Sequence, residues 1–127
     1  MGYCEKYGYT PDSDAIAGSI QAIASNLDNL GTEEILRKCF SLMDLTTLHT
    51  QDTPASVEKL VRKANAIRKE FPGYPLPASV CVFPNFASVV RGLREDPALH
   101  VTAVSACFPT SQSFQEVKEL ECRLAVR

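Results

Sequence analysis

Five stretches of the chain repeat apolar residues every three or four positions, a spacing that predicts amphipathic helices. The first stretch starts at Asp12 and ends near Asn29 and Gly31, and its apolar stripe comprises Ile16, Ile20, Ile23 and Leu27. The second follows Thr32 as its N-cap, with two glutamates in the first turn, where the helix dipole favours negative charge. Residues 1–11 mix aromatic and polar side chains with a glycine and a proline, so we expect an arm there rather than an element.

The other three predicted helices are marked by cap residues and prolines. One follows Thr53, an N-cap with proline at the next position, and Pro72 stops it. Its predicted buried stripe is Val57, Leu60, Val61, Ala64 and Ile67. Another opens at Pro84, and the last begins at Ser113, which forms a capping-box pattern with Glu116. The inward-facing residues expected on these two helices are Phe86, Val89, Val90, Leu93, Val117, Leu120 and Leu124.

Three apolar runs between these helices, at 42–48, 78–83 and 100–106, have the length and β-branched content of buried strands. Single helices between strands imply right-handed crossovers and a parallel sheet. The repeating unit is then one strand plus one helix, as in a (β/α)8 barrel. Because such a barrel takes eight strands and typically about 250 residues, we expect either a small open α/β protein or the leading part of a longer one.

Composition narrows the range of partners. With 127 residues, 45% of them hydrophobic and 22% charged, the chain resembles one soluble globular domain. A net charge of -2 without a long basic block argues against nucleic acid or a membrane surface as partner. No apolar run approaches the roughly 18 residues of a membrane span, and the N-terminus lacks the apolar segment of a signal peptide. We therefore expect a cytoplasmic protein.

The five cysteines are scattered, with no C-x-x-C pair and no histidine at metal-ligand spacing. This pattern predicts reduced thiols and no metal site. For Cys39 and Cys122 the simplest interpretation is that of small apolar side chains in packed helices. The complete set is Cys4, Cys39, Cys81, Cys107 and Cys122.

The run 42–48 places one carboxylate, Asp44, and two threonines inside an otherwise apolar strand. An ionised acid among leucines is costly unless it is paired or hydrogen-bonded. We expect Asp44 and Thr46 near the carboxyl end of the strand, where α/β folds bind their ligands. The alternative is an acid that ties down a neighbouring loop, with threonines present because they suit strands.

Three blocks of sequence, in this order, resemble the first three barrel strands of the deoxyribose-phosphate aldolases. They are LMDLTTL at 42–48, ASVCVFP at 78–84 and VSACFPTSQ at 104–112, the last followed by EVK at 116–118. The two leading helices are similar, more loosely, to the N-terminal extension of one bacterial branch. The resemblance implies a partial TIM (β/α)8 barrel: an arm and two helices at 1–40, then about three β/α units at 41–127.

Such an aldolase is a lyase that cleaves 2-deoxyribose 5-phosphate reversibly into acetaldehyde and glyceraldehyde 3-phosphate through a lysine Schiff base. The resemblance therefore implies no cofactor and no metal, small phosphosugar and aldehyde substrates, and a homo-oligomer or pairing through exposed strand edges. The family's Schiff-base lysine, its second catalytic aspartate and its phosphate loops belong to later strands. None of the six lysines here lies in a predicted strand, and a nucleophilic lysine needs a desolvated or cation-crowded site. The 127-residue chain alone is expected to be inactive.

The resemblance assigns five residues to substrate binding: Asp44, Thr46, Leu48, Cys81 and Phe108. Asp44 would support the hydrogen-bond network near the sugar hydroxyls, and Thr46 would offer a hydroxyl group. Leu48 and Phe108 would form apolar walls, and Cys81 would lie near the reacting aldehyde. Ordinary roles stay open for each, such as a core leucine or an inert buried thiol.

Two other classes of function stay open. A small self-associating α/β binding module without catalysis would cover its strand edges with another copy. A thiol-based redox protein is the other. Catalysis by a serine, histidine and aspartate set lacks support, because the chain has no G-x-S-x-G turn.

Overall fold

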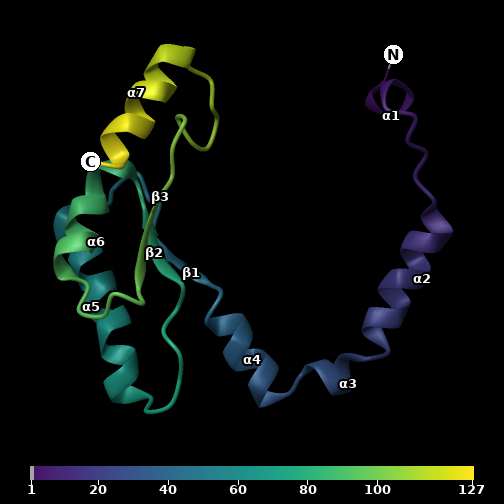
Figure 1. Ribbon diagram of the computed structural model, residues 1–127, viewed down its shortest axis with the longest axis horizontal. Coiled ribbons are helices and arrows are strands. Elements are labelled where there is room, and N and C mark those ends of the chain that lie inside the picture. Colours follow the sequence, from purple (N-terminus) through teal and green to yellow (C-terminus); the bar gives the residue numbers. More distant parts are fainter. Residues whose placement is uncertain (1) are drawn as a thin grey trace. The chain divides into compact units, whose positions relative to one another are not determined.

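The computed structural model describes residues 2–127. The chain divides into two compact units, one that runs up to Leu36 and one that spans Arg37–Arg127. In chain order the elements are α1 (Tyr3–Lys6), α2 (Ser13–Ala24), α3 (Leu27–Leu30), α4 (Glu33–Phe40), β1 (Asp44–Thr46), α5 (Pro54–Glu70), β2 (Ser79–Val82), the 3-10 helix η1 (Pro84–Phe86), α6 (Ala87–Leu93), β3 (His100–Ala103) and α7 (Gln115–Ala125) (Figure 1). The predicted alternation of strands and helices is confirmed from β1 onward, whereas four described helices rather than two precede β1.

The described residues of the first unit form helices joined by loops, and its helices are shorter than predicted. Asp12 caps α2, as its Oδ1 accepts hydrogen bonds from the backbone N–H of Asp14 and Ala15. The helix stops at Ala24 rather than continuing to Gly31, because the Ser25 hydroxyl bonds the carbonyl of Ala22 and so competes with the helical pattern. The arm predicted at 1–11 contains the short helix α1. No residue of α2 is buried within this structure.

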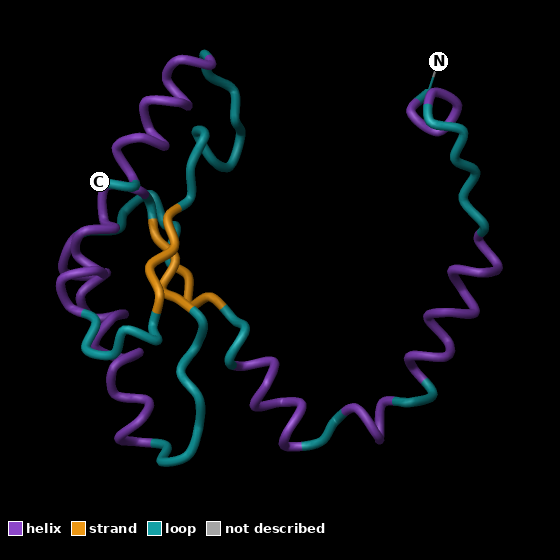
Figure 2. Tube along the Cα trace, viewed as in Figure 1, coloured by secondary structure: helices purple, strands orange, loops and turns teal. Residues whose placement is uncertain are grey.

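The second unit contains a sheet of three parallel strands in the order β1-β2-β3, as predicted (Figure 2). The register pairs Asp44 with Ser79, Thr46 with Cys81, and Cys81 with Thr102. The strands are shorter than the runs at 42–48, 78–83 and 100–106. Asp44 begins β1 instead of lying at its carboxyl end, so that expectation is wrong for Asp44, whereas Thr46 does end the strand.

Helices α5 and α6 supply the apolar layer that packs on the sheet (Figure 1). The residues with no exposed surface are Val57, Val61, Ala64, Val80, Val82, Val90 and Leu99. Burying a valine or leucine side chain stabilises a fold by about 1.5–3 kcal/mol relative to leaving it in water, so this layer dominates the stability of the unit. The stripe predicted for α5 is confirmed, since Leu60 and Ile67 pack against the same cluster.

The ends of α5 are also as predicted. The Thr53 hydroxyl accepts a hydrogen bond from the Ser56 N–H at 3.2 Å, and the Ser56 hydroxyl accepts one from the Thr53 N–H at 3.0 Å. After the helix, Gly73 adopts a φ of 85°, a conformation that favours glycine, and its carbonyl accepts a hydrogen bond from Arg37 at 2.6 Å. The Arg37 guanidinium also stacks 4.0 Å from the centre of the Tyr74 ring. These contacts hold Arg37, the first residue of the second unit, against the loop between α5 and β2.

The last helix departs most from prediction. Phe114, not Ser113, is the N-cap of α7 and its side chain provides no capping hydrogen bond, so the predicted capping box is wrong. The stripe Val117, Leu120 and Leu124 is expected to face inward, yet these side chains are about half exposed. Within the second unit the apolar core formed by α5, α6 and the sheet excludes this stripe. The helix therefore presents an apolar face that the core does not cover.

Candidate functional site

Alternation along the strands gives the sheet two chemically different faces. Val80 and Val82 point into the core with α5 and α6. The other face carries polar and thiol side chains in register across all three strands, namely Asp44, Thr46, Ser79, Cys81, His100 and Thr102. We call this set the polar face. Cys81 therefore points away from the helix layer, the orientation that its predicted role requires.

A chain of hydrogen bonds crosses the polar face from β1 to β3. The Ser79 hydroxyl lies 2.5 Å from Asp44 Oδ1 and 2.7 Å from the Thr102 hydroxyl. An ionised carboxylate only accepts hydrogen bonds and a serine has one hydroxyl hydrogen. Ser79 therefore donates to Asp44, and Thr102 donates to Ser79. Asp44 is therefore hydrogen-bonded, as expected for an acid in this run, and the residue is exposed.

Ser79 and Thr102 are not among the predicted site residues. Ser79 is 2% exposed and is the only buried polar residue among those whose burial the structure describes. The sequence holds a signal for Ser79, whereas only the strand register places Thr102 beside the predicted residues. Period-two alternation from Cys81 leads to Ser79, and the strand register leads from Cys81 to Thr102.

Cys81 is a poor nucleophile in this structure. Burial raises the pKa of its thiol, the nearby Asp44 charge raises it further, and a hydrogen bond with Thr46 opposes both. The net direction is upward, so the thiol is protonated near neutral pH. Cys81 can line a ligand site, whereas thiolate chemistry there is disfavoured.

The loop after β1 is organised around Asp52. Its carboxylate accepts hydrogen bonds from the Thr47 hydroxyl at 2.8 Å, the His49 N–H at 3.0 Å and the Ser56 hydroxyl at 3.0 Å. The Thr47 bond is the largest cause that holds the pKa of Asp52 below its ordinary value; burial opposes it, and the other hydrogen bonds and the His49 charge add to it. Leu48, a predicted pocket wall, is half-buried in this loop.

Phe108 lies in the loop between β3 and α7 and is 48% exposed. The two residues that precede Phe108, Ala106 and Cys107, have φ values of 56° and 58°. This left-handed conformation costs energy for residues with a side chain. The structure thus brings together Asp44, Thr46 and Cys81, and leaves Leu48 and Phe108 on separate loops.

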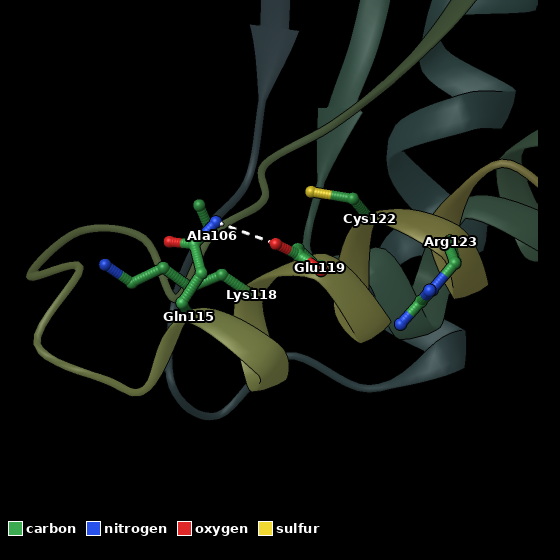
Figure 3. Close-up of a pocket in the computed structure, with 6 residues that line it drawn as sticks. All are labelled: Ala106, Gln115, Lys118, Glu119, Cys122 and Arg123. Atoms are coloured by element: carbon green, nitrogen blue, oxygen red, sulfur yellow. Dashed lines mark hydrogen bonds between the residues drawn. The ribbon is translucent and has the colours of Figure 1, made fainter.

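Three cavities of the second unit are lined by residues other than the five predicted ones. One, of about 430 Å³, lies between α7 and the segment after β3 (Figure 3). Figure 3 also shows Gln115 and Glu119 of α7, whose side chains form a 3.0 Å hydrogen bond beside it. A second, of about 880 Å³, lies among α6, β3 and the end of α7.

All six lysines lie in helices, Lys6 in α1, Lys38 in α4, three in α5 and Lys118 in α7. None of the six lysines lies in a strand of the sheet. Among residues 2–127, no group of three or more histidine, cysteine, aspartate or glutamate side chains is arranged to hold a metal ion. The described helices are all too short or too polar to cross a membrane.

Comparison with known proteins relates the chain to an aldolase by name. No model of a known protein family matches the chain. A Caenorhabditis elegans protein named "Putative deoxyribose-phosphate aldolase" is 31% identical over 117 residues. That alignment covers 91% of this chain and 38% of the relative. The chain therefore spans little more than a third of the length of the protein it matches, and the match includes all three strands.

Proposed function

We propose that this chain forms the first three β/α units of a deoxyribose-phosphate aldolase, a lyase that reversibly cleaves 2-deoxyribose 5-phosphate to acetaldehyde and glyceraldehyde 3-phosphate. The similarity to the Caenorhabditis elegans protein supports the family. The three parallel strands, connected in order through α5 and α6, have the topology of consecutive barrel units.

The observation that carries the proposal is the contrast between the two faces of the sheet. In a (β/α)8 barrel the helices cover the outer face and the opposite face lines the interior. Here the face opposite α5 and α6 holds a carboxylate, three hydroxyl groups and a thiol. Hydrogen-bond donors and acceptors of this kind suit the hydroxyl groups of a sugar.

In the proposed site Asp44 orients a substrate hydroxyl or a water molecule, with its carboxylate held by Ser79. Thr46 supplies a second hydroxyl at the carboxyl end of β1. Cys81 forms the floor of the site near the reacting aldehyde, and Leu48 and Phe108 form apolar walls on their loops. These assignments follow the family resemblance residue by residue.

The covalent chemistry belongs to other units in this proposal. A Schiff-base lysine needs a desolvated environment that lowers its pKa, and the lysines of this chain lie on helices. The 127-residue chain should bind and cleave no substrate by itself. The complementary part of an aldolase would supply the lysine, its proton-transfer partners and the phosphate site.

The test is complementation. The chain is produced together with the part of the Caenorhabditis elegans relative that lies outside the matched 117 residues, and co-purification reports assembly. Acetaldehyde release from 2-deoxyribose 5-phosphate is expected from the assembled pair only, with the borohydride-trapped adduct on the relative's segment. Replacing Asp44→Asn should lower turnover of the pair without preventing co-purification. An assembled pair without turnover, or an adduct on this chain, would contradict the proposal.

A second candidate function is self-association without catalysis. It is favoured by the outer edges of β1 and β3, which are unpaired in the three-stranded sheet, and by the exposed stripe of α7. Unpaired edges tend to be covered by another chain. Light scattering over a range of concentrations separates the two ideas: a monomer that unfolds cooperatively counts against pairing through these edges.

A further inference from the structure

Two cysteines far apart in sequence lie on neighbouring segments of the second unit. Cys107 follows β3 in the loop that leads to α7, and Cys122 lies near the end of α7. The Cys122 sulfur is 2.8 Å from the Ser105 hydroxyl oxygen, and the Cys107 N–H donates to Glu121 Oε2 at 2.9 Å. Two separate hydrogen bonds therefore hold the segment 105–107 along the helix residues 121–122.

The direction of the Cys122 side chain supports the same pairing. Cys122 and Ala106, the residue between Ser105 and Cys107, line one cavity. Figure 3 shows the Cys122 thiol turned from α7 toward the segment that carries Ala106. A disulfide needs Cα atoms about 4.4–6.8 Å apart and both side chains directed toward each other, so its formation requires the Cys107 side chain to face the helix. The segment that follows Cys107 is exposed from residue 108 to residue 117.

Other cysteines are less suited to pair with Cys122. Cys81 is buried on the polar face of the sheet, and burial raises the pKa of its thiol. Cys39 lies in α4, outside the segments 105–107 and 121–122 that the two hydrogen bonds join. Cys122 is exposed and Cys107 is half-buried, so a small reagent can reach both. The interpretation of Cys122 as a packed apolar side chain is wrong, and the same exposure applies to Cys39.

We propose that Cys107 and Cys122 form an oxidation-sensitive thiol pair that low-molecular-weight disulfides such as oxidised glutathione convert into an intramolecular disulfide. The Cys122 thiolate attacks one glutathione sulfur, forms a mixed disulfide and releases one glutathione thiolate. The Cys107 thiolate then attacks the Cys122 sulfur, and the second glutathione leaves. The two protons lost by the protein thiols end on the two glutathione thiols, and the two electrons from the protein sulfurs reduce the glutathione disulfide.

The bond would close residues 107–122, which comprise the loop after β3 and the first two turns of α7. Because effective concentrations between groups joined by a short flexible segment are on the order of millimolar, this reaction should outcompete pairing between chains at micromolar protein. The closed loop carries Phe108, so oxidation would restrict the loop to which a substrate wall is assigned. The thiol pair itself does not depend on the proposed aldolase function.

The test is a peptide map of the folded 127-residue chain after treatment with oxidised glutathione and alkylation of the remaining thiols. Trypsin cleaves after Arg94, Lys118 and Arg123, so Cys107 lies in peptide 95–118 and Cys122 in peptide 119–123. The disulfide-linked pair of these peptides should exceed any other linked pair by roughly tenfold. Dithiothreitol should separate it again.

Matched variants make the outcome decisive. Cys107→Ser and Cys122→Ser should each abolish the linked pair, whereas Cys39→Ser should leave it unchanged. A parallel reaction in urea tests the role of the fold, because an unfolded chain pairs its cysteines without this preference. The proposal is overturned if the folded wild type yields no linked pair of 95–118 with 119–123. It is equally overturned if other pairings are as abundant, or if the preference is the same in urea.

Discussion

Alternate residues of the same three strands form the two faces of the sheet, and the two faces are stabilised differently. The face toward α5 and α6 is apolar, and Val80, Val82 and Leu99 have no exposed surface. The polar face is held by hydrogen bonds, chiefly the chain from Asp44 through Ser79 to Thr102. The comparison teaches that the first face specifies the fold, whereas the second face is available for chemistry. The predictions below test this division.

The largest effect is expected on the helix-covered face. Leu99→Ala removes a fully buried side chain and leaves a cavity, so the free energy of unfolding should fall by about 2–5 kcal/mol. The matched change on the other face is His100→Ala, at the exposed neighbouring residue, which should alter it by at most about 0.5 kcal/mol. Urea unfolding of both variants measures the difference. Equal losses would mean that the two faces are not distinct in energy.

A smaller effect is expected from the hydrogen-bond chain. Ser79→Ala removes the group between Asp44 and Thr102, and should cost about 1 kcal/mol of unfolding free energy, since exposed Asp44 regains water. Thr102→Val keeps the shape of the side chain and removes only the hydroxyl.

The two changes should not add, because both break the same bond. A double-mutant cycle is expected to give a coupling of at least about 0.5 kcal/mol. Additive losses would show that Ser79 and Thr102 stabilise the sheet independently.

Much of the helix-covered face could be predicted from sequence because apolar periodicity reports burial directly. The stripe of α5, the helix at Phe86–Leu93 and the parallel strand order all follow from that signal. The capping box at Ser113 failed because the same short pattern occurs without capping, and here Phe114 takes that position. Exposure of Val117, Leu120 and Leu124 could not be foreseen, because an amphipathic pattern does not say whether a partner surface is present.

The polar face was predicted less completely for a related reason. Asp44 stands out among apolar neighbours in the sequence, whereas Ser79 and Thr102 resemble ordinary strand residues until the register aligns them. Strand register depends on which residues pair across strands, and local pattern leaves it open. The position of Asp44 at the start of β1 likewise depends on where pairing begins.

Thiol reactivity tests how deeply Cys81 is buried on the polar face, with Cys122 of α7 as the exposed reference. Cys81 is buried and its pKa is raised by burial, so its reaction with iodoacetamide near neutral pH should be at least about tenfold slower than that of exposed Cys122. Labelling for increasing times, followed by peptide mass spectrometry, measures both rates in one sample. Thr46→Val removes the hydrogen bond that opposes the shift and should slow Cys81 further. Comparable rates at the two cysteines would contradict a buried thiol on the polar face.

The smallest effect is expected at the loop that follows β1. The pKa of Asp52 lies below its ordinary value of 3.8, mainly because of the hydrogen bond from Thr47. The folded chain therefore binds this proton more weakly than the unfolded chain does. Its contribution to stability is present above about pH 4 and disappears as the pH falls through the lower, folded pKa.

Asp52→Asn should thus destabilise the chain near neutral pH and have less effect in acid. Thr47→Val removes the largest cause of the shift, so the pKa of Asp52 should rise toward its ordinary value; the variant should be less stable near neutral pH and should lose less stability on acidification than the wild type. Urea midpoints measured from about pH 7 down to about pH 3 test both variants. A Thr47→Val profile that coincides with the wild type would mean that the Thr47 bond does not hold the loop, and that the loop after β1 is fastened by backbone contacts instead.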